Sequence, residues 1–277
     1  MFFITTQEGW VVGGGFFQGQ QLVLHTTNEG LAWQDQSQTI RNLNKNIHLN
    51  KVCFADKDHG FIVSNGDYSG LYTSDGGTTW ASKDVSNDKY AILFTSTDEG
   101  WSAGTVYTIA LTTNEGYSWT EKNRVSSANM LRAICFVATS EGWFVGDLGE
   151  ILFTNNDGIT WTKQTPPDAS INFTGVSFLN TLEGYMVGSS GVILHTTNEG
   201  SSWTNGTNNP AEPAGYTCIK FVSSQEGWAS TSSHLYRYLN GSWVKQPGNT
   251  GANDLFFVDP LHGWAVGSGG SILNCYP

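Results

Sequence analysis

Short apolar runs recur along the whole chain, and turn residues separate them. In GWFVGDLGEILFT (142–154) and GYMVGSSGVILHT (184–196), two mostly apolar runs flank a glycine-containing turn. Runs of this length, rich in β-branched and aromatic residues and bounded by glycine, are typical of β-strands. No stretch of the chain reaches the roughly 20 apolar residues that a membrane-spanning helix needs, so we expect no direct membrane insertion.

Two phrases repeat together with these strands. The first is a four-residue phrase such as SEGW or LHGW, which ends in glycine and an aromatic residue and stands seven times directly before an apolar strand. The second has the form TTNEGSSW (196–203), with five full copies and a shortened one that ends at Trp243. Together they give a period of about 40 residues that holds four strands, which is the size of one propeller blade. In order along each period we name the strands A, B, C and D. The aromatic residues of the first phrase are Trp10, Phe61, Trp101, Trp143, Tyr185, Trp228 and Trp264.

The repeats predict an all-β protein, a single seven-bladed β-propeller of four-stranded antiparallel blades. A two-domain β-sandwich is the alternative, because evenly spaced turns suit both folds. The last repeat stops after its strand C, so we expect either a three-stranded seventh blade or a ring closed by residues absent from this sequence. An exposed strand C edge, at 271–275, would invite a partner strand. The predicted blades are approximately 1–44, 45–90, 91–131, 132–172, 173–215, 216–250 and 251–277.

The second phrase matches the Asp-box, S/T-x-D/N-x-G-x-S/T-W, known from sialidases and other propellers. Its third residue is suited to bond backbone N–H groups of its own turn, its glycine to adopt positive φ, and its tryptophan to cover the turn. A calcium loop is the competing interpretation, but the spaced carboxylates of such a loop are missing, so we expect no metal. The residues given these structural roles are Asn28, Gly30, Trp33, Asp75, Gly77, Trp80, Asn114, Gly116, Trp119, Asn156, Gly158, Trp161, Asn198, Gly200 and Trp203.

Composition narrows the choice of partners. The net charge is -11 and the pI is near 4.8, which argues against nucleic acid or an anionic membrane as the main partner. The four cysteines lack CxxC spacing and are predicted to be free, mostly buried thiols. The histidines in repeated positions, His25, His59, His195 and His262, are read as structural, whereas His48 and His234 have no assigned role. No cofactor is expected.

The predicted propeller separates charges between its two edges. The turn edge, made of the A–B and C–D turns, carries many carboxylates, from Glu8 and Glu29 to Asp259, against Lys57 alone. The loop edge, made of the D–A connections and the B–C turns, is mildly basic and less repetitive, and function tends to reside in variable loops on a rigid scaffold. The balancing of charge for solubility is the alternative explanation. The binding residues predicted on the loop edge are Arg41, Lys45, Lys89, Arg124 and Arg132.

The alternation of FVxxxxGWxVGxxGxILxT with an Asp-box over all seven repeats resembles the Ycf48/HCF136-like family of photosystem II assembly factors. The resemblance implies a non-catalytic scaffold or binding module, assembly-factor-like or at the cell surface, that docks a protein or glycan through its loop edge. In photosynthetic members an arginine cluster is associated with docking onto a membrane-protein precursor. Because such propellers are mostly exported, we expect a periplasmic or extracellular location, although the chain as given shows no signal peptide.

A glycoside hydrolase, like the sialidases and xyloglucanases with Asp-box propellers, is the alternative function. Such an enzyme needs a pair of carboxylates beside the scissile bond. Asp67 and Asp147, both in predicted B–C turns, are candidates for that pair, but the arginine triad and the tyrosine nucleophile of a sialidase are not recognisable. The sequence therefore favours a binding module over an enzyme.

Overall fold

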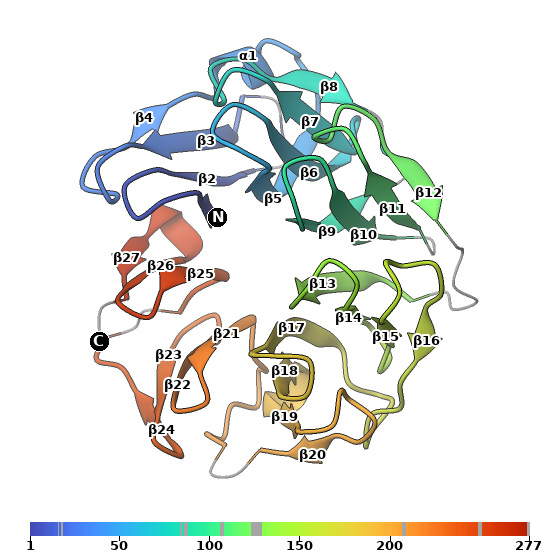
Figure 1. The fold of residues 1–277 in the computed structure, drawn as a ribbon. Coiled ribbons are helices and arrows are strands. Elements are labelled where there is room, and N and C mark those ends of the chain that lie inside the picture. The colour runs from blue at the N-terminus through green and yellow to red at the C-terminus, as the bar shows by residue number, and fades with distance from the viewer. Residues whose placement is uncertain are drawn as a thin grey trace. The chain divides into compact units, whose positions relative to one another are not determined.

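The computed structural model describes residues 1–15, 17, 19–83, 85, 88–105, 108–122, 129–206, 209–248 and 251–275. Its strands form six four-stranded sheets and one three-stranded sheet, all antiparallel (Figure 1). These sheets are the blades of a seven-bladed β-propeller, as predicted, and the three-stranded blade is the last. The chain divides into two compact units, Met1–Met130 with three blades and Leu131–Pro277 with four.

The first unit holds the first three sheets in chain order. The first sheet consists of β1 (Phe2–Phe3), β2 (Gly9–Gly14), β3 (Gln21–Thr26) and β4 (Gln34–Asp35), and the short helix α1 (Gln38–Arg41) follows it. The second consists of β5 (Ile47–Phe54), β6 (Gly60–Gly66), β7 (Gly70–Thr73) and β8 (Ala81–Lys83). The third consists of β9 (Lys89–Phe94), β10 (Gly100–Gly104), β11 (Ile109–Thr112) and β12 (Thr120–Lys122).

The second unit holds the other four sheets. The fourth sheet consists of β13 (Leu131–Phe136), β14 (Gly142–Gly146), β15 (Ile151–Thr154) and β16 (Thr162–Lys163). The fifth consists of β17 (Phe173–Phe178), β18 (Gly184–Gly188), β19 (Ile193–Thr196) and β20 (Thr204–Asn205), with the 3₁₀ turn η1 (Ser189–Gly191) between β18 and β19. The sixth consists of β21 (Cys218–Ser223), β22 (Glu226–Ser230), β23 (Leu235–Leu239) and β24 (Ser242–Lys245). The last consists of β25 (Asp254–Asp259), β26 (His262–Val266) and β27 (Ile272–Asn274), with the 3₁₀ turn η2 (Ser268–Gly270) before β27.

The glycine of the first repeated phrase lies beneath a phenylalanine ring of strand A in the same blade. A Cβ atom on Gly184 would meet the ring of Phe178 at 2.5 Å, closer than real Cβ contacts allow. The same crowding recurs in every blade, so a side chain at this position displaces the ring. The other pairs are Gly9 with Phe3, Gly60 with Phe54, Gly100 with Phe94, Gly142 with Phe136, Gly227 with Phe221 and Gly263 with Phe257.

The aromatic residue after that glycine joins its blade to the next. Trp143 of the fourth blade stacks on Phe178 of the fifth, with ring centroids 3.5 Å apart and an interplanar angle of 9°. Tyr185 stacks on Phe221 in the same way at 3.7 Å. Such pairs contribute roughly 0.5–1.5 kcal/mol beyond the burial of their area. The remaining pairs of this kind within a unit are Trp10 with Phe54 and Trp228 with Phe257.

The four cysteines are free, as predicted. Cys53, Cys218 and Cys275 are buried and Cys135 is partly buried. Burial raises the pKa of the Cys53 thiol to about 11 and that of Cys275 to about 12. These thiols are therefore apolar core residues rather than nucleophiles at neutral pH.

Candidate binding surfaces

Each full Asp-box forms a tight turn between strands C and D. In the fifth blade Glu199 and Gly200 have φ angles of 60° and 78°, and the N–H of Ser201 donates to the carbonyl of Asn198 at 2.9 Å. Two consecutive positive φ angles define a type I′ turn. The Asn198 side chain accepts the backbone N–H of Ser202 at 3.0 Å, while Trp203 is buried below the turn. The two positive φ angles and the side-chain bond recur in the other four full boxes, whereas the burial of the tryptophan is shared only by Trp80.

The first threonine of the box, to which the sequence analysis gave no role, is the centre of its hydrogen bonds. The Thr196 hydroxyl donates to Asn198 Oδ1 at 2.9 Å and accepts the N–H groups of Asn198 at 3.3 Å and Gly200 at 3.0 Å. All five of these threonines are buried, so no solvent molecule replaces the bonds they make. The sequence held a signal for this role, because the first position of the box is threonine in all five full copies and never an aliphatic residue. The equivalents are Thr26, Thr73, Thr112 and Thr154.

The box turn is tied to the A–B turn of its own blade. The N–H of the fourth box residue donates to a backbone carbonyl there, as from Glu199 to Leu182 at 3.1 Å and from Glu115 to Asp98 at 3.0 Å. Both kinds of turn therefore lie together at the turn edge of a blade. The remaining bonds run from Glu29 to Gln7, from Gly76 to Asp58, from Asp157 to Ser140 and from Asn240 to Gln225.

The residue after strand D reaches the box of the next blade. Gln164 donates through Nε2 to the carbonyl of Glu199 at 2.6 Å, and its Oε1 lies 2.1 Å from where a Cβ on Gly200 would stand. Gln36 occupies the same place against Gly77. The box glycine is thus required for two reasons, a positive φ and the close approach of a neighbouring side chain.

On the loop edge of the first unit, Arg41 is held in place while part of its guanidinium stays accessible. Its Nε donates to the carbonyl of Gln21 at 3.1 Å, its Nη1 lies 3.1 Å from Asp35 Oδ2, and its side chain is 30% exposed. Ser37 hydrogen bonds lower the pKa of the Asp35 carboxyl, which stays ionised beside the arginine. Lys45 lies nearby in sequence and is exposed.

In the second unit, Arg132 on β13 forms a two-point contact with Asp147 of the B–C turn. Its Nη2 lies 2.9 Å from Asp147 Oδ2, and its Nε donates to Oδ1 of the same carboxylate. Its side chain is 36% exposed. Arg124, the remaining predicted arginine of the loop edge, lies outside the described residues.

Lys89 does not occupy the exposed position expected of a binding residue. It is the first residue of β9, it is fully buried, and its Nζ donates to the hydroxyl of Thr108. The third blade starts earlier than predicted, so Lys89 belongs to strand A rather than to the connection before it. The loop-edge set that the structure describes at the surface is therefore Arg41, Lys45 and Arg132.

The two carboxylates considered for glycoside hydrolysis have structural partners. Asp67 accepts the N–H of Asn46 at 2.9 Å and returns its own N–H to the carbonyl of Asn46. Asp147 is ion-paired with Arg132. They belong to different units of the chain, and each closes a B–C turn against strand A or the segment before it.

Histidines in repeated positions pack in repeated ways. His195 stacks on Tyr185 at 4.3 Å and lies 3.3 Å from Glu183, and His25 stacks on Trp10 at 4.6 Å and lies 3.1 Å from Glu8. These contacts agree with a structural role. His234, which had no predicted role, lies 3.0 Å from Glu212, which also accepts the Tyr236 hydroxyl.

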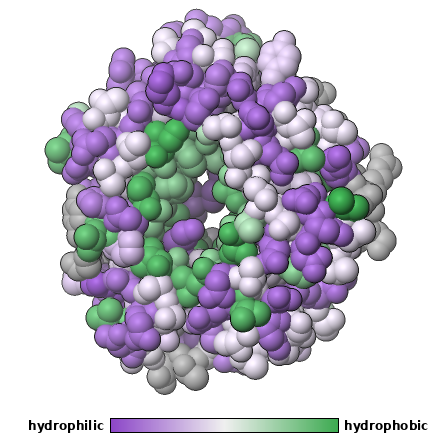
Figure 2. Space-filling model, in the orientation of Figure 1, coloured by the Kyte–Doolittle hydropathy of each residue, from purple (hydrophilic) through white to green (hydrophobic). Residues whose placement is uncertain are grey.

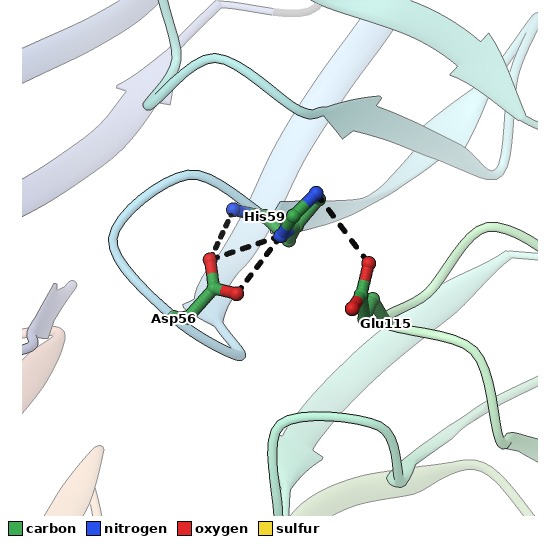
Figure 3. Close-up of side chains that lie close together, drawn as sticks. All are labelled: Asp56, His59 and Glu115. Atoms are coloured by element: carbon green, nitrogen blue, oxygen red, sulfur yellow. Dashed lines mark hydrogen bonds and ion pairs between the residues drawn. The ribbon is translucent and has the colours of Figure 1, made fainter.

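His59 on the turn edge of the first unit lies between two carboxylates from different blades (Figure 3). Its Nδ1 is 2.9 Å from Asp56 Oδ2, and its Nε2 is 3.4 Å from Glu115 Oε2. The hydrogen bond that the His59 ring donates to the Asp56 carboxylate raises the pKa of His59. Burial opposes ionisation of Asp56, but hydrogen bonds from the His59 ring and backbone outweigh it and lower the pKa of that carboxyl.

These three side chains are also the one group of described residues in which three potential metal ligands lie within 4.8 Å of one another. A single ion would need His59 and both carboxylates to converge on one point. Instead the carboxylates contact opposite nitrogens of the ring, whose lone pairs diverge (Figure 3). The arrangement suits an imidazolium that faces two carboxylates better than a three-ligand metal site.

The turn edge combines this acidity with isolated apolar side chains. A polar cavity of about 480 Å³ opens in the first unit between residues of its first two blades, with Glu8, His25, Asp35, Asp58 and Asp75 among those that line it. On the face drawn in Figure 2, hydrophilic and hydrophobic residues are interspersed. The exposed apolar residues at box or A–B turns include Leu31, Tyr117, Ile159, Leu182 and Leu261.

A match to a protein-family model shows which family this chain belongs to. The model described as "Photosynthesis system II assembly factor YCF48" matches residues 34–127 and 121–241. The chain belongs to the YCF48 family. No curated protein matches it.

Solved YCF48 structures have the same fold as this YCF48-family chain. YCF48 from Cyanidioschyzon merolae is 16% identical, with a TM-score of 0.77 over 100% of this chain and 94% of its own. A structure described as YCF48 bound to D1 peptide is 17% identical, with a TM-score of 0.77 over 99% of this chain and 91% of its own. The GH74 xyloglucanase from Xanthomonas campestris is 12% identical, with a TM-score of 0.70 over 96% of this chain and 53% of its own.

Within the residues that the structure describes, neither unit of this YCF48-family chain assembles the arginine cluster that the family resemblance implies. Among the arginines in the described ranges, Arg41 belongs to the first unit, and Arg132 and Arg237 lie in different blades of the second. Arg237 is on the turn edge, 2.5 Å from Glu226 Oε1. No helix within the described residues is long and apolar enough to cross a membrane.

Proposed function

We propose that this chain is a non-catalytic, assembly-factor-like binding module that docks an extended segment of a partner protein through its loop edge. The observation that supports the proposal most directly is the likeness to YCF48 bound to D1 peptide, which extends over 99% of this chain. A YCF48 propeller with a bound peptide is thus a precedent, within the family, for peptide binding by this fold. Glycan binding, the other ligand class expected from the sequence, becomes an outcome of the test.

The loop edge supplies positioned cations for such a segment. Arg41 is fixed by Asp35 and by the Gln21 carbonyl, and its Nη2 donors have no partner among the residues that the structure describes. A guanidinium that is already oriented loses little side-chain entropy when it binds a carboxylate. Exposed Lys45 adds a second positive charge four residues later. We therefore expect the partner segment to carry carboxylates where it meets this part of the loop edge.

Peptide binding tests the proposal. Overlapping 15-residue peptides of the D1 protein and scrambled versions of each are labelled, and their Kd values are measured by fluorescence anisotropy. We expect a subset of the native peptides to bind and the scrambled versions to bind at least tenfold more weakly. The double variant Arg41→Ala/Lys45→Glu is expected to raise Kd at least fivefold, because each lost charge-assisted contact is worth about 1 kcal/mol.

Lys57→Glu is the matched control for Lys45→Glu. Both are exposed lysines of the first unit, but Lys57 is on the turn edge beside Asp58. Its reversal is expected to change Kd less than twofold at physiological ionic strength. The proposal is contradicted if no peptide binds in a sequence-dependent way, or if Lys57→Glu weakens peptide binding as much as the double variant does. Binding of the chain to a glycan array, without peptide binding, would instead indicate a glycan-binding function.

A further inference from the structure

The end of strand D in one blade faces the Asp-box of the next blade, and we call the place between them the interblade space. Between the second and third blades, Lys83 at the end of β8 fills this space. Its Nζ lies 3.6 Å from the ring centroid of Tyr117, in the box of the third blade, and 5.8 Å from that of Tyr72 on β7. The chain itself therefore shows that the interblade space receives the ammonium group of a lysine side chain.

The interblade space between the first and second blades is open. Gln36 occupies the position of Lys83, three residues after the box tryptophan, and its shorter side chain reaches His25, the equivalent of Tyr72. Nε2 of Gln36 lies 3.4 Å from Nδ1 of His25. A cavity of about 480 Å³ remains there, which is within the size range of pockets that hold ligands.

The side chains that line this cavity present hydrogen-bond acceptors that lack donors. Glu8 contacts His25 through Oε1 at 3.1 Å, and Asp58 contacts Lys57 through Oδ2 at 2.6 Å. The other oxygen of each carboxylate has no partner among the residues that the structure describes, and the same is true of the buried Oε1 atom of Gln36. The Glu8 and Asp58 side chains are 30% and 47% exposed, so a ligand can reach them. Such a lining favours a ligand that brings several N–H donors.

The lining of the cavity also carries uncompensated negative charge. Of its four carboxylates, two have a basic partner, Asp35 with Arg41 and Asp58 with Lys57. The other two, Glu8 and Asp75, pair with no lysine or arginine of the described ranges. Burial opposes ionisation of Asp75, but hydrogen bonds from Thr79 outweigh it and lower the pKa of that carboxyl. A cation is therefore the ligand that this charge favours.

The corresponding interblade space of the second unit shows that blade packing does not require an acidic lining. Between the fourth and fifth blades, a cavity of about 340 Å³ has Phe153 and Lys163 among its lining residues. These two residues occupy the positions that His25 and Asp35 hold in the first unit. The acidic lining is therefore a local property of the first two blades, and a ligand explains it better than the fold does.

We infer that the cavity between the first and second blades binds a lysine side chain of a second partner protein, whose ammonium group donates to the free carboxylate oxygens of the lining. The inference goes beyond the proposed function, because this cavity opens on the turn edge, whereas the partner proposed above docks on the loop edge. A neighbouring cavity of about 210 Å³ shares His25 and Gln34 with it and is also lined by Trp33. That cavity offers space for the residues that flank the lysine, which favours a protein segment over a free amine.

The probe is a capped seven-residue peptide of glycine and serine with one central lysine. Its matched control has norleucine in place of lysine, which keeps the four-carbon stem and removes the charge. Binding to the whole chain is measured from NMR shifts of the backbone amides. We expect saturable shifts at residues 34–38 and 75–78 with the lysine peptide, and at least roughly tenfold weaker binding of the norleucine peptide.

Charge variants of the lining test its role in both directions. Glu8→Gln and Asp58→Asn are each expected to weaken binding of the lysine peptide about fivefold. Glu99→Gln is the matched control, because Glu99 holds the position of Glu8 in the A–B turn of the third blade, away from the cavity. Lys57→Ala frees the second oxygen of Asp58 and is expected to strengthen binding at least roughly twofold, a direction that damage to the fold does not produce.

Gln36→Lys tests the comparison with the second blade. It places a lysine of the chain itself where Lys83 stands, so it is expected to fill the cavity and abolish binding of the lysine peptide, whereas Gln36→Met retains it. Equal binding of the lysine and norleucine peptides, or unchanged binding by Gln36→Lys, overturns the inference. Binding of n-butylamine as tightly as the lysine peptide also overturns it, by making a small amine the occupant. If the lysine peptide binds and no D1 peptide does, the inference survives and the proposed function fails.

Discussion

The Nε2 atom of His59 lies 3.4 Å from Oε2 of Glu115, so a side chain in an A–B turn of the second blade faces one in the C–D turn of the third. The other ring nitrogen of His59 is bonded to Asp56 in its own turn. Protonation of a single imidazole therefore strengthens contacts within one blade and between two. This relationship makes the turn edge of the first unit sensitive to pH.

Replacement of His59 by glutamine should destabilise the chain more at pH 5.5 than at pH 9. The Asp56 hydrogen bond raises the pKa of His59 above the ordinary 6.5, so the folded state binds the proton more tightly than the unfolded state. The resulting stability is complete below the unfolded pKa and is lost as the pH rises through the folded one. Because the ring is 27% exposed, we expect no more than about 1 kcal/mol from urea unfolding.

His48→Gln is the control for this prediction. Nδ1 of His48 lies 2.9 Å from Asn50 Oδ1, an amide rather than a carboxylate. If His59→Gln lowered the stability equally at both pH values, protonation of His59 would not contribute to the stability of this contact.

Thr196→Val should destabilise the chain by about 2–3 kcal/mol, because the N–H groups of Asn198 and Gly200 lose a buried acceptor with no change in side-chain volume. Thr197→Val makes the same chemical change at an exposed position of the same turn, and it should stay within about 0.5 kcal/mol. Urea unfolding midpoints of the two variants compare them directly. Similar midpoints would mean that the box does not depend on its first hydroxyl.

Gly184→Ala should cost about 1–3 kcal/mol, because the added Cβ meets the Phe178 ring at 2.5 Å and that ring is already stacked against Trp143. Gly13→Ala, also in a strand B, places its Cβ where no atom lies within 4 Å. We expect that control to leave the thermal midpoint nearly unchanged. If the two variants melt alike, ring packing is not the reason for glycine in the first repeated phrase.

Gly200→Ala should be more harmful than Gly269→Ala. Both residues have positive φ, 78° and 71°, but only the new Cβ at Gly200 collides with a neighbour, Gln164 Oε1 at 2.1 Å. Backbone strain alone is worth about 1–2 kcal/mol. A double-mutant cycle with Gln164→Ala should recover at least roughly 0.5 kcal/mol of the excess. Strict additivity of the two substitutions would show that the side chain moves aside without cost.

The repeats were sufficient to predict the seven blades and the missing last strand, because each strand is short, bounded by glycine and present in several copies. The same copies did not reveal why Gly184 and its equivalents are needed, since the ring above each glycine comes from Phe178 and its equivalents, earlier in the sequence. Contacts between blades, such as Gln164 with Glu199, were invisible for the same reason.

Individual surface residues were harder to predict than the scaffold. Lys89 was expected at the surface and is buried, because strand A of the third blade begins two residues before the predicted boundary of that blade. Glu115 was recognised as one acidic residue among many on the turn edge. Its position opposite His59 depends on how one blade packs on the next, which a repeat within a single sequence does not contain.

In the Asp-box, the residues that form the turn differ from the residue that is exposed to a binding partner. Its threonine, its asparagine or aspartate, its glycine and its tryptophan are all committed to internal contacts, while the sixth position points outward and holds Leu31, Thr78, Tyr117, Ile159 or Ser201. Apart from Tyr117, which meets Tyr72 edge-on and lies under the Lys83 ammonium, substitutions at that position should therefore cost the scaffold little. A descendant of this chain can acquire a new turn-edge surface one residue per blade, and a protein engineer can do the same.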